Sequence, residues 1–239
     1  MNERADPTGD ALSALSALGE PNRRALYDYV TSRGGWVSRD EAADAVGLER
    51  GTAAHHLDRL ASDGLLEIDY RRLTGRQGPG AGRPAKLYRR ARREFGVSLP
   101  PRRYDLAGRL LAEAADSART GGDDIDTALA NAARGEGRRL AREVREKLRG
   151  ITGRTRSARR SAAVDALRRL GYEPVVCEDG SVALRNCPFH HLAAEHTELI
   201  CGMNLCLLDA AVDELGHTGL RAELDPEEGL CCVKLRPAR

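Results

Sequence analysis

The feature that most limits how this sequence can fold is a set of cysteines in its last third. Residues 186–206 contain three of the six cysteines and three of the six histidines, and a vicinal pair, Cys231 and Cys232, lies near the C-terminus. In a chain otherwise poor in cysteine, thiols and imidazoles gathered in this way usually indicate a bound metal or a redox centre. Thiols this far apart in sequence can meet only if the surrounding domain folds around a common centre.

Three of these cysteines lie on different predicted elements. Cys187 follows a strand and begins a helix, where unpaired backbone N–H groups lower the pKa of a thiol. Cys201 lies on the next helix and Cys231 on the last strand. Because neighbouring side chains of a strand point to opposite faces, we expect Cys231 on the inner face with Val233, and Cys232 on the outer face. We therefore predict Cys231 as a metal ligand and Cys232 as a spare thiol or a structural bystander.

The spacing of the cysteines favours some centres over others. Zinc sites usually take their ligands in close Cys-x2–4-Cys pairs, and ferredoxins in compact runs of cysteine; neither spacing occurs among Cys187, Cys201 and Cys231. Widely spaced thiolates are compatible with an iron–sulfur cluster, whose larger body can be reached from several elements. Cys177 and Cys206 are expected to be small core residues, because free cysteine is often buried as a hydrophobe.

The N-terminal third has the pattern of a helix-turn-helix. Helices are predicted at residues 11–18, 21–32, 38–45 and 50–63, the third opening with a capping box of Ser38 and Glu41. An apolar stripe on the fourth helix faces inward and consists of Ala53, Leu57, Leu60 and Ala61. Its outward side carries the four residues predicted to contact bases and phosphates: Arg50, Thr52, His55 and Arg59. Two short helices joined by a glycine-containing turn, the second polar on its free side, are typical of a helix-turn-helix.

A basic hairpin follows this helix. Strands predicted at residues 65–70 and 86–88 flank an arginine- and glycine-rich tip, which has almost no apolar residues and so cannot be packed inside the protein. Flexible arginines on such a wing suit the phosphate backbone or the minor groove of DNA. The four arginines predicted to make these contacts are Arg71, Arg72, Arg76 and Arg83.

Charge is segregated along the chain. Residues 66–103 carry eleven arginines or lysines against three acidic residues, and residues 134–169 carry thirteen against four. Residues 173–232 instead carry twelve acidic residues against two arginines. This asymmetry indicates that only the first part meets nucleic acid. No apolar stretch is long enough to span a membrane, and the N-terminus lacks the apolar core of a signal peptide. We therefore expect a cytoplasmic protein with reduced thiols.

The N-terminal region resembles the ArsR-type winged-helix regulators. The resemblance covers residues 11–92 and rests on the order of the helices, the sequence His55-His56-Leu57 and the Gly82-Arg83-Pro84 hairpin. It implies a winged helix-turn-helix domain that binds double-stranded DNA. In a dimer, helix 50–63 of each subunit would enter successive major grooves of a palindromic operator.

Two further regions are predicted beyond a boundary at Pro100 and Pro101. Helices at residues 102–119 and 125–149 have apolar positions that suit either a dimerising linker or packing within one subunit. These positions are Leu106, Leu110, Leu111, Ala114, Leu129, Leu140, Val144 and Leu148. After residue 156 the predicted element order is α, β, β, α, α, β, β. The predicted fold is therefore α+β, with a winged helix-turn-helix domain at 1–100, a helical dimerisation linker at 101–156 and a small sensor domain at 157–239.

The two ends of the chain together resemble the SufR-type iron–sulfur-responsive repressors. The resemblance rests on a winged helix followed by the Cys187-Pro188 motif, by Cys201 and by a terminal Cys-x-apolar-x-apolar strand that begins at Cys231. It implies a homodimeric repressor whose [4Fe-4S] or [2Fe-2S] cluster sets operator affinity at genes for cluster assembly or for iron and redox homeostasis. By this resemblance Cys187, Cys201 and Cys231 are cluster ligands.

The sequence departs from this pattern at the fourth ligand, because the third cysteine is doubled and no further cysteine follows. The candidates are His190, His196, Cys206, Cys232 or a small molecule, and we predict His190. Two alternatives stay open. One is a sensor in which the same thiols bind zinc or form a disulfide. The other is an enzyme with Cys187 as nucleophile; since no Gly-rich phosphate loop or paired carboxylates support it, we predict no enzymatic activity.

Overall fold

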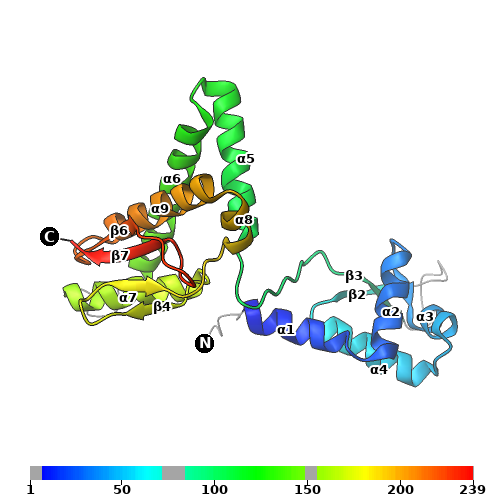
Figure 1. The fold of residues 1–239 in the computed structure, drawn as a ribbon. Coiled ribbons are helices and arrows are strands. Elements are labelled where there is room, and N and C mark those ends of the chain that lie inside the picture. The colour runs from blue at the N-terminus through cyan, green and yellow to red at the C-terminus, as the bar shows by residue number, and fades with distance from the viewer. Residues whose placement is uncertain (1–6, 72–83, 149–154, 239) are drawn as a thin grey trace. The chain divides into compact units, whose positions relative to one another are not determined.

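The computed structural model describes residues 7–71, 84–148 and 155–238 (Figure 1). The chain forms two compact units, Met1–Val97 and Ser98–Arg239, each with a hydrophobic core of its own. The division lies close to the boundary expected at Pro100 and Pro101, but the helices expected as a separate linker belong to the second unit. Within the described ranges, no helix is long and apolar enough to span a lipid bilayer.

Four helices form most of the first unit: α1 (Pro7–Ala17), α2 (Pro21–Ser32), α3 (Arg39–Val46) and α4 (Arg50–Ser62). Glu20 caps α2 by accepting hydrogen bonds from two backbone N–H groups of its first turn, at 3.0 and 2.7 Å. Ser38 caps α3 by accepting from the N–H of Glu41 at 3.2 Å. Gly47 ends α3 in the left-handed conformation that glycine adopts without strain. The predicted cap at Ser38 and the predicted helix end at Gly47 are confirmed.

A three-stranded antiparallel sheet completes the first unit. Its strands are β1 (Val37–Ser38), β2 (Leu66–Arg71) and β3 (Ala85–Arg90), in the order β1-β3-β2. Val37, Leu66 and Tyr88 point into the same core as the apolar residues of α2 and α4. The strands β2 and β3 form the expected hairpin, and its tip at residues 72–83 lies outside the described residues.

The helix α1 is buried through its alanines and not through its leucines. Ala11, Ala14 and Ala17 are at most 5% exposed, whereas Leu12 and Leu15 are each 47% exposed. Small side chains let α1 lie close to its neighbours, and this rotation leaves the two leucines on the outward side. The helix was predicted from its leucine spacing, but that spacing does not identify the buried face.

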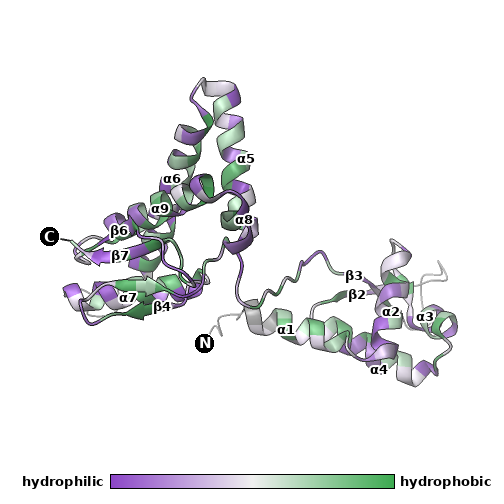
Figure 2. Cartoon of the chain, viewed as in Figure 1, coloured by the Kyte–Doolittle hydropathy of each residue, from purple (hydrophilic) through white to green (hydrophobic). Residues whose placement is uncertain are grey.

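Three long helices form the helical layer of the second unit: α5 (Tyr104–Gly121), α6 (Ile125–Leu148) and α9 (Thr197–Leu215), with α6 packed against the other two. Hydrophobic and hydrophilic positions alternate along α5 and α6 in Figure 2, as expected of helices with one buried face. Leu106, Leu110 and Leu129 are at most 3% exposed and share a core with Met203 and Leu207 of α9. These apolar positions are therefore used within one subunit.

A glycine allows α6 and α9 to approach closely. A Cβ atom at Gly137 would overlap the backbone carbonyl oxygen of Leu207. The neighbouring residue, Glu136, is buried and accepts hydrogen bonds from Arg109 of α5 and Arg139 of α6, both at 2.7 Å. Backbone contact on one side and a buried ion pair on the other thus fix the position of α6 between its neighbours.

An antiparallel four-stranded sheet forms the rest of the second unit. Its strands β4 (Pro174–Val176), β5 (Val182–Leu184), β6 (Leu220–Leu224) and β7 (Val233–Pro237) follow the order β4-β5-β7-β6, and α7 (Arg156–Arg169) and α8 (His190–Glu195) complete the predicted element order. One face places Val182, Leu184 and Leu235 in the core, all 0% exposed. The opposite face carries Lys234 and Arg236, both paired with acidic residues. This alternation is typical of an antiparallel sheet with one solvated face.

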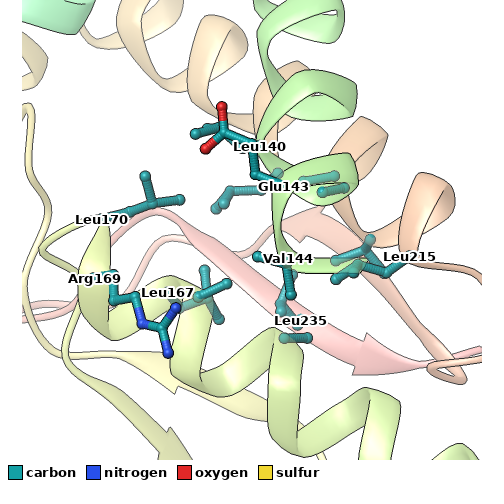
Figure 3. Close-up of a pocket in the computed structure, with 14 residues that line it drawn as sticks. Leu140, Glu143, Val144, Leu167, Arg169, Leu170, Leu215 and Leu235 are labelled. Carbon is teal, nitrogen blue, oxygen red and sulfur yellow. The ribbon is translucent and has the colours of Figure 1, made fainter. Parts of the chain in front are cut away.

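An apolar pocket of about 200 Å³ lies between α6, α7, α9 and β7. The side chains of Ala163 and Ala166 form part of its α7 wall, and side chains this short do not fill the space between packed helices. Leucines and valines form most of the rest of its lining, and six of them are labelled in Figure 3: Leu140, Val144, Leu167, Leu170, Leu215 and Leu235.

Candidate functional site

The outward side of α4 is the first candidate site. Ala53, Leu57 and Leu60 are 0% exposed and fix the helix against the core. Burial of this stripe leaves the opposite side of the helix in solvent. The four residues predicted to contact DNA are all exposed there: Arg50, Thr52, His55 and Arg59.

Three arginines near this surface pair with carboxylates. The partners of Arg50, Arg59 and Arg71 are Asp40 at 2.6 Å, Asp63 at 2.9 Å and Asp69 at 2.6 Å, respectively. Exposed ion pairs such as those of Arg50 and Arg71 contribute little to stability, so a phosphate of DNA can replace their carboxylates at small cost. The side chain of Asp63 is only 8% exposed, and the pair with Arg59 is therefore not of this kind.

Asp58 fastens α4 to the sheet. Its carboxylate accepts hydrogen bonds from Nζ of Lys86 and from the hydroxyl of Tyr88, both at 2.6 Å. Partial burial opposes ionisation, but these two hydrogen bonds lower the pKa of Asp58. Burial and the hydrogen bond to Asp58 raise the pKa of Tyr88. Tyr88 thus stays a donor and Asp58 an acceptor at neutral pH, and β3 holds the orientation of α4.

Trp36 supports the base of the wing. The guanidinium groups of Arg71 and Arg89 lie 5.0 and 4.4 Å from the centroid of its ring, within the range of cation–π interactions. This role was not predicted from the sequence; the signal available for it was a single tryptophan beside arginine-rich strands. Three of the predicted wing contacts lie outside the described residues: Arg72, Arg76 and Arg83.

The second candidate site is a group of four thiols in the second unit. Cys187 lies in the loop after β5, Cys201 in the first turns of α9, and Cys231 and Cys232 directly before β7. Because β5 and β7 are antiparallel neighbours, the end of one lies beside the start of the other. The backbone N–H of Cys231 accordingly donates to the carbonyl oxygen of Leu184 at 2.8 Å. The strand order therefore brings together thiols that are far apart in sequence.

Two pairs of these thiols lie close enough to shift each other's pKa. A hydrogen bond from Cys231 lowers the pKa of Cys187 to about 7, against the effect of burial and with help from a backbone N–H and the charge of Arg102. The same hydrogen bond, together with burial, raises the pKa of Cys231. Burial and a hydrogen bond to Cys232 raise the pKa of Cys201 to about 12, and the charge of Cys187 adds to this effect. The two thiol pairs therefore lie next to each other.

Four thiols in one place are a suitable ligand set for a soft metal centre. Thiolates favour zinc and iron–sulfur clusters over hard cations such as magnesium. Among the residues that the structure describes, no three His, Cys, Asp or Glu side chains are already arranged as ligands of a metal ion. The thiols of Cys187 and Cys231, and those of Cys201 and Cys232, instead affect each other's pKa, and their protons must leave when sulfur binds metal.

Cys232 lies with the other thiols, contrary to the expectation that it points away from them. The strand β7 begins at Val233, so Cys232 precedes it and the alternation of strand faces does not apply. His190 is exposed at the start of α8, its ring centroid 5.4 Å from that of His191. Its role as fourth ligand stays a prediction.

A buried polar pair supports the thiols from the protein interior. Nδ2 of Asn204 donates to Sγ of Cys231 at 3.4 Å, and Oδ1 of Asn204 accepts from the hydroxyl of Tyr172. Both residues are at most 2% exposed. Burial raises the pKa of Tyr172, which therefore remains a donor. An asparagine on an otherwise apolar helix was the sequence signal for this pair, which we did not predict.

Comparison with known proteins finds a match for part of the first unit. Residues 18–69, which contain α2, α3 and α4, match a family model described as a helix-turn-helix domain. No curated protein matches the chain significantly, and no solved structure does. Residues 18–69 therefore form a helix-turn-helix domain, which supports a DNA-binding transcription regulator of the ArsR or winged-helix kind.

Proposed function

We propose that the chain is a homodimeric transcription repressor whose affinity for a palindromic operator is set by an iron–sulfur cluster, either [4Fe-4S] or [2Fe-2S]. The observation that carries this proposal is the convergence of Cys187, Cys201, Cys231 and Cys232 from three separate segments of the second unit. Four thiolates are the common ligand set of such clusters. The resemblance to SufR-type repressors favours the same assignment.

We assign the fourth ligand to Cys232 in place of His190. The thiol of Cys232 lies close enough to Cys201 to raise its pKa, whereas the side chain of His190 is exposed. The backbone N–H of His190 donates to the carbonyl oxygen of Cys187 at 3.1 Å. The backbone of His190 therefore helps to shape the turn that carries the first ligand, and its imidazole remains the alternative fourth ligand.

A bound cluster would supply iron–thiolate bonds that respond to oxidation and to iron supply. Residues of the chain outside the ligand set would stabilise four thiolates held close together. The positive charge of Arg102 favours the ionised form of Cys187, and the N–H of Asn204 points at the sulfur of Cys231. Such contacts from outside the ligand set orient the ligands and tune the centre.

The DNA-binding surface consists of α4 and the wing. We propose that Arg50, Thr52, His55 and Arg59 enter the major groove. Arg71, together with Arg72, Arg76 and Arg83 of the wing, contacts phosphates and makes the affinity salt-dependent. The helix-turn-helix match and the exposure of α4 support this assignment.

The proposed dimer needs an apolar surface that is free in one subunit. Leu106, Leu110 and Leu129 are buried within the chain and cannot supply it. Leu12 and Leu15, both half exposed on the outward side of α1, can. We therefore place the dimer contact at α1, where two-fold pairing also suits a two-fold operator.

Anaerobic purification followed by absorption spectra and by iron and sulfide counts tests the cluster. We expect a brown wild-type protein, loss of most iron in Cys201→Ser and Cys232→Ser, and retention in Cys206→Ser, a matched change elsewhere on α9. A wild-type protein that binds no iron contradicts the proposal. If His190→Ala loses the cluster and Cys232→Ser keeps it, the fourth ligand is the histidine.

DNA binding is tested with duplexes selected from a random-sequence library. Their affinity is measured with and without the cluster at one fixed salt concentration, since binding to DNA is salt-dependent. We expect the two forms to differ by about 5- to 150-fold, the usual range of coupling between two sites. Equal affinity of the two forms contradicts control by the cluster but not DNA binding itself.

One observation favours a second candidate, a thiol or zinc sensor on the same DNA-binding domain. The neighbouring Cys231 thiol lowers the pKa of Cys187 to about 7, and a lowered pKa favours the thiolate, which is the nucleophilic form of cysteine. An oxidant such as dioxygen or hydrogen peroxide would take two electrons from this pair to form a disulfide; the protein then loses two hydrogen atoms, which mass spectrometry detects. A colourless protein that contains zinc, or one whose DNA affinity changes with this disulfide alone, favours the second candidate.

A further inference from the structure

The chain segment that leads into α5 is bound to the loop that carries Cys187. This segment, residues 98–103, begins the second unit and directly follows the DNA-binding unit in sequence. The guanidinium group of Arg102 donates to Oδ1 of Asn186 at 2.5 Å and to the carbonyl oxygen of Cys187 at 3.4 Å. The backbone N–H of Arg103 donates to the carbonyl oxygen of Pro188 at 3.0 Å. Asn186, Cys187 and Pro188, in the loop that carries the first thiol, are thus hydrogen-bonded to Arg102 or Arg103 of the segment 98–103.

Asn186 joins a third segment to these two. Its Nδ2 donates to the carbonyl oxygens of Pro101 at 3.0 Å and of Gly171, in the turn between α7 and β4, at 2.5 Å. Gly171 has a φ of +89°, and a Cβ atom there would lie 3.0 Å from Cβ of Pro101. Glycine thus permits both the backbone conformation and the close approach of the proline. Asn186 is only 6% exposed, so its bonds are not exchanged readily for water.

We propose that these contacts form a latch. Whether the Cys187 sulfur is free or bound to a cluster determines, through this latch, the conformation of residues 98–103, which connect in sequence to the DNA-binding unit. The latch consists of Pro101, Arg102, Arg103 and Asn186, and it rests on the proposed function in that cluster binding is the signal it passes. Arg102 and Asn186 are positioning residues, since they act through the thiol loop and not on DNA.

The reason for the coupling is chemical. Cys187 and Cys231 lie at the adjacent ends of β5 and β7, where the backbone N–H of Cys231 donates to the carbonyl oxygen of Leu184 at 2.8 Å. A cluster held by both residues would have to fit between these two chain segments and would therefore act on the turn that carries Cys187. The carbonyl oxygen of Cys187 is a partner of Arg102. A movement of Cys187 would therefore act on Arg102, through the carbonyl oxygen, and on the preceding residue Asn186, both of which belong to the latch.

The test uses the full chain and three variants. Arg102→Ala removes two bonds of the latch while leaving a partly exposed site that can be solvated, and Asn186→Ala removes its buried centre. Arg185→Ala is the matched control, because Arg185 is an exposed neighbour of Asn186 and has no side-chain hydrogen bond within the described residues. For each protein we measure iron content, DNA affinity with and without the cluster, and hydrogen exchange of the Arg103 amide in the metal-free form.

We expect the wild type and Arg185→Ala to bind DNA with clearly different affinities in the two states. The latch variants should take up the cluster, but the ratio of their two affinities should fall to below about threefold, well under the typical upper range of coupling. Their Arg103 amide should exchange faster than in the control. Latch variants that keep both the wild-type ratio and the wild-type exchange overturn the proposal.

Failure of the latch can be distinguished from failure of the proposed function. If the wild type itself shows no difference between its two states, the cluster does not control DNA binding, and the latch has no signal to pass. Hydrogen exchange in the metal-free protein still shows whether the linker is tied to the thiol loop. Unchanged exchange in Asn186→Ala, should that variant fold, or in Arg102→Ala shows that the tie does not exist.

Discussion

Asn204 is the residue through which the protein interior acts on the thiols. Its Nδ2 donates to Sγ of Cys231, and Tyr172 fixes the amide by donating to its oxygen. Replacement by alanine leaves the sulfur without this donor, and changes outside the ligand set typically weaken metal binding by about 10- to 100-fold. We predict that Asn204→Ala loses iron to a competing chelator faster than wild type by this order.

The matched control is Asn131→Ala, an exposed asparagine on α6. It should retain iron as the wild type does. Tyr172→Phe keeps the amide in place but frees its rotation, so its effect should be smaller and in the same direction. Equal iron retention in Asn204→Ala and Asn131→Ala would show that the amide does not support the cluster.

Ala166 belongs to the wall of the apolar pocket between α6, α7 and α9. Leucine at this position adds three carbon atoms to a space of about 200 Å³ without introducing a poor helix former. Filling an apolar cavity usually raises the free energy of unfolding by about 0.5–2 kcal/mol. Ala166→Leu should therefore require more urea to unfold, whereas Ala112→Leu, on the exposed side of α5, should not. Lower stability of Ala166→Leu would mean that the pocket is already filled in solution.

The direction of a single side chain is harder to predict from sequence than the presence of a helix or strand. Strand alternation predicts that Cys232 points away from Cys231, but β7 begins only at Val233, so the alternation does not extend to these two residues. A slip of this size is small along the chain but reverses the direction of a side chain. Cys187, Cys201 and Cys231 could be grouped beforehand because cysteine chemistry, unlike direction, is visible in the sequence itself.

At the level of elements, most helices and strands could be predicted because their ends are marked by local chemistry. Ser38 and Gly47 bound α3, and the spacing of apolar residues places α5 and α6 close to their observed ranges. The spacing of apolar residues shows that a helix has a buried face, but it does not show which element packs against that face. Leu106 and Leu110 suited a second subunit as well as α6 and α9, and only the assembled core decides between them.

Gly137 gives a direct test of how α6 and α9 pack. Alanine favours a helix over glycine by about 1 kcal/mol when nothing else changes. At Gly137, however, the added methyl group would overlap the Leu207 carbonyl oxygen, and backbone cannot move aside cheaply. We predict that Gly137→Ala lowers the free energy of unfolding by about 1–3 kcal/mol, as overpacking typically does.

Gly135 lies on the same helix with nothing within 4 Å of the added methyl group, so Gly135→Ala should raise stability instead. Urea unfolding of the two variants gives opposite signs if the helices cross as described. A gain of stability in Gly137→Ala would mean that α6 and α9 lie farther apart.

At the scale of the whole molecule, the predicted DNA contacts and the thiols divide between the two units. The exposed residues of α4 belong to Met1–Val97, and the four thiols belong to Ser98–Arg239. The charge pattern of the sequence does not follow this division, because the basic residues 134–169 and the acidic segment 173–232 both lie in the second unit. A cluster on the second unit should consequently stabilise that unit and leave the first unaffected.

The single tryptophan makes this consequence measurable. Trp36 lies in the first unit, so its fluorescence follows the unfolding of that unit, while the absorbance of the cluster follows the second. A ligand present at 1,000 times its Kd stabilises the state that binds it by about 4 kcal/mol. For a unit of this size such a loss lowers the melting temperature by at least about 10 °C. We predict that Cys201→Ser lowers the transition seen by circular dichroism for the second unit by this amount and leaves the Trp36 transition in place. Cys206→Ser, on the same helix, should shift neither. If the Trp36 transition shifts together with that of the second unit, the two units unfold cooperatively. The contacts of the latch would then contribute to stability as well as to the control of DNA binding.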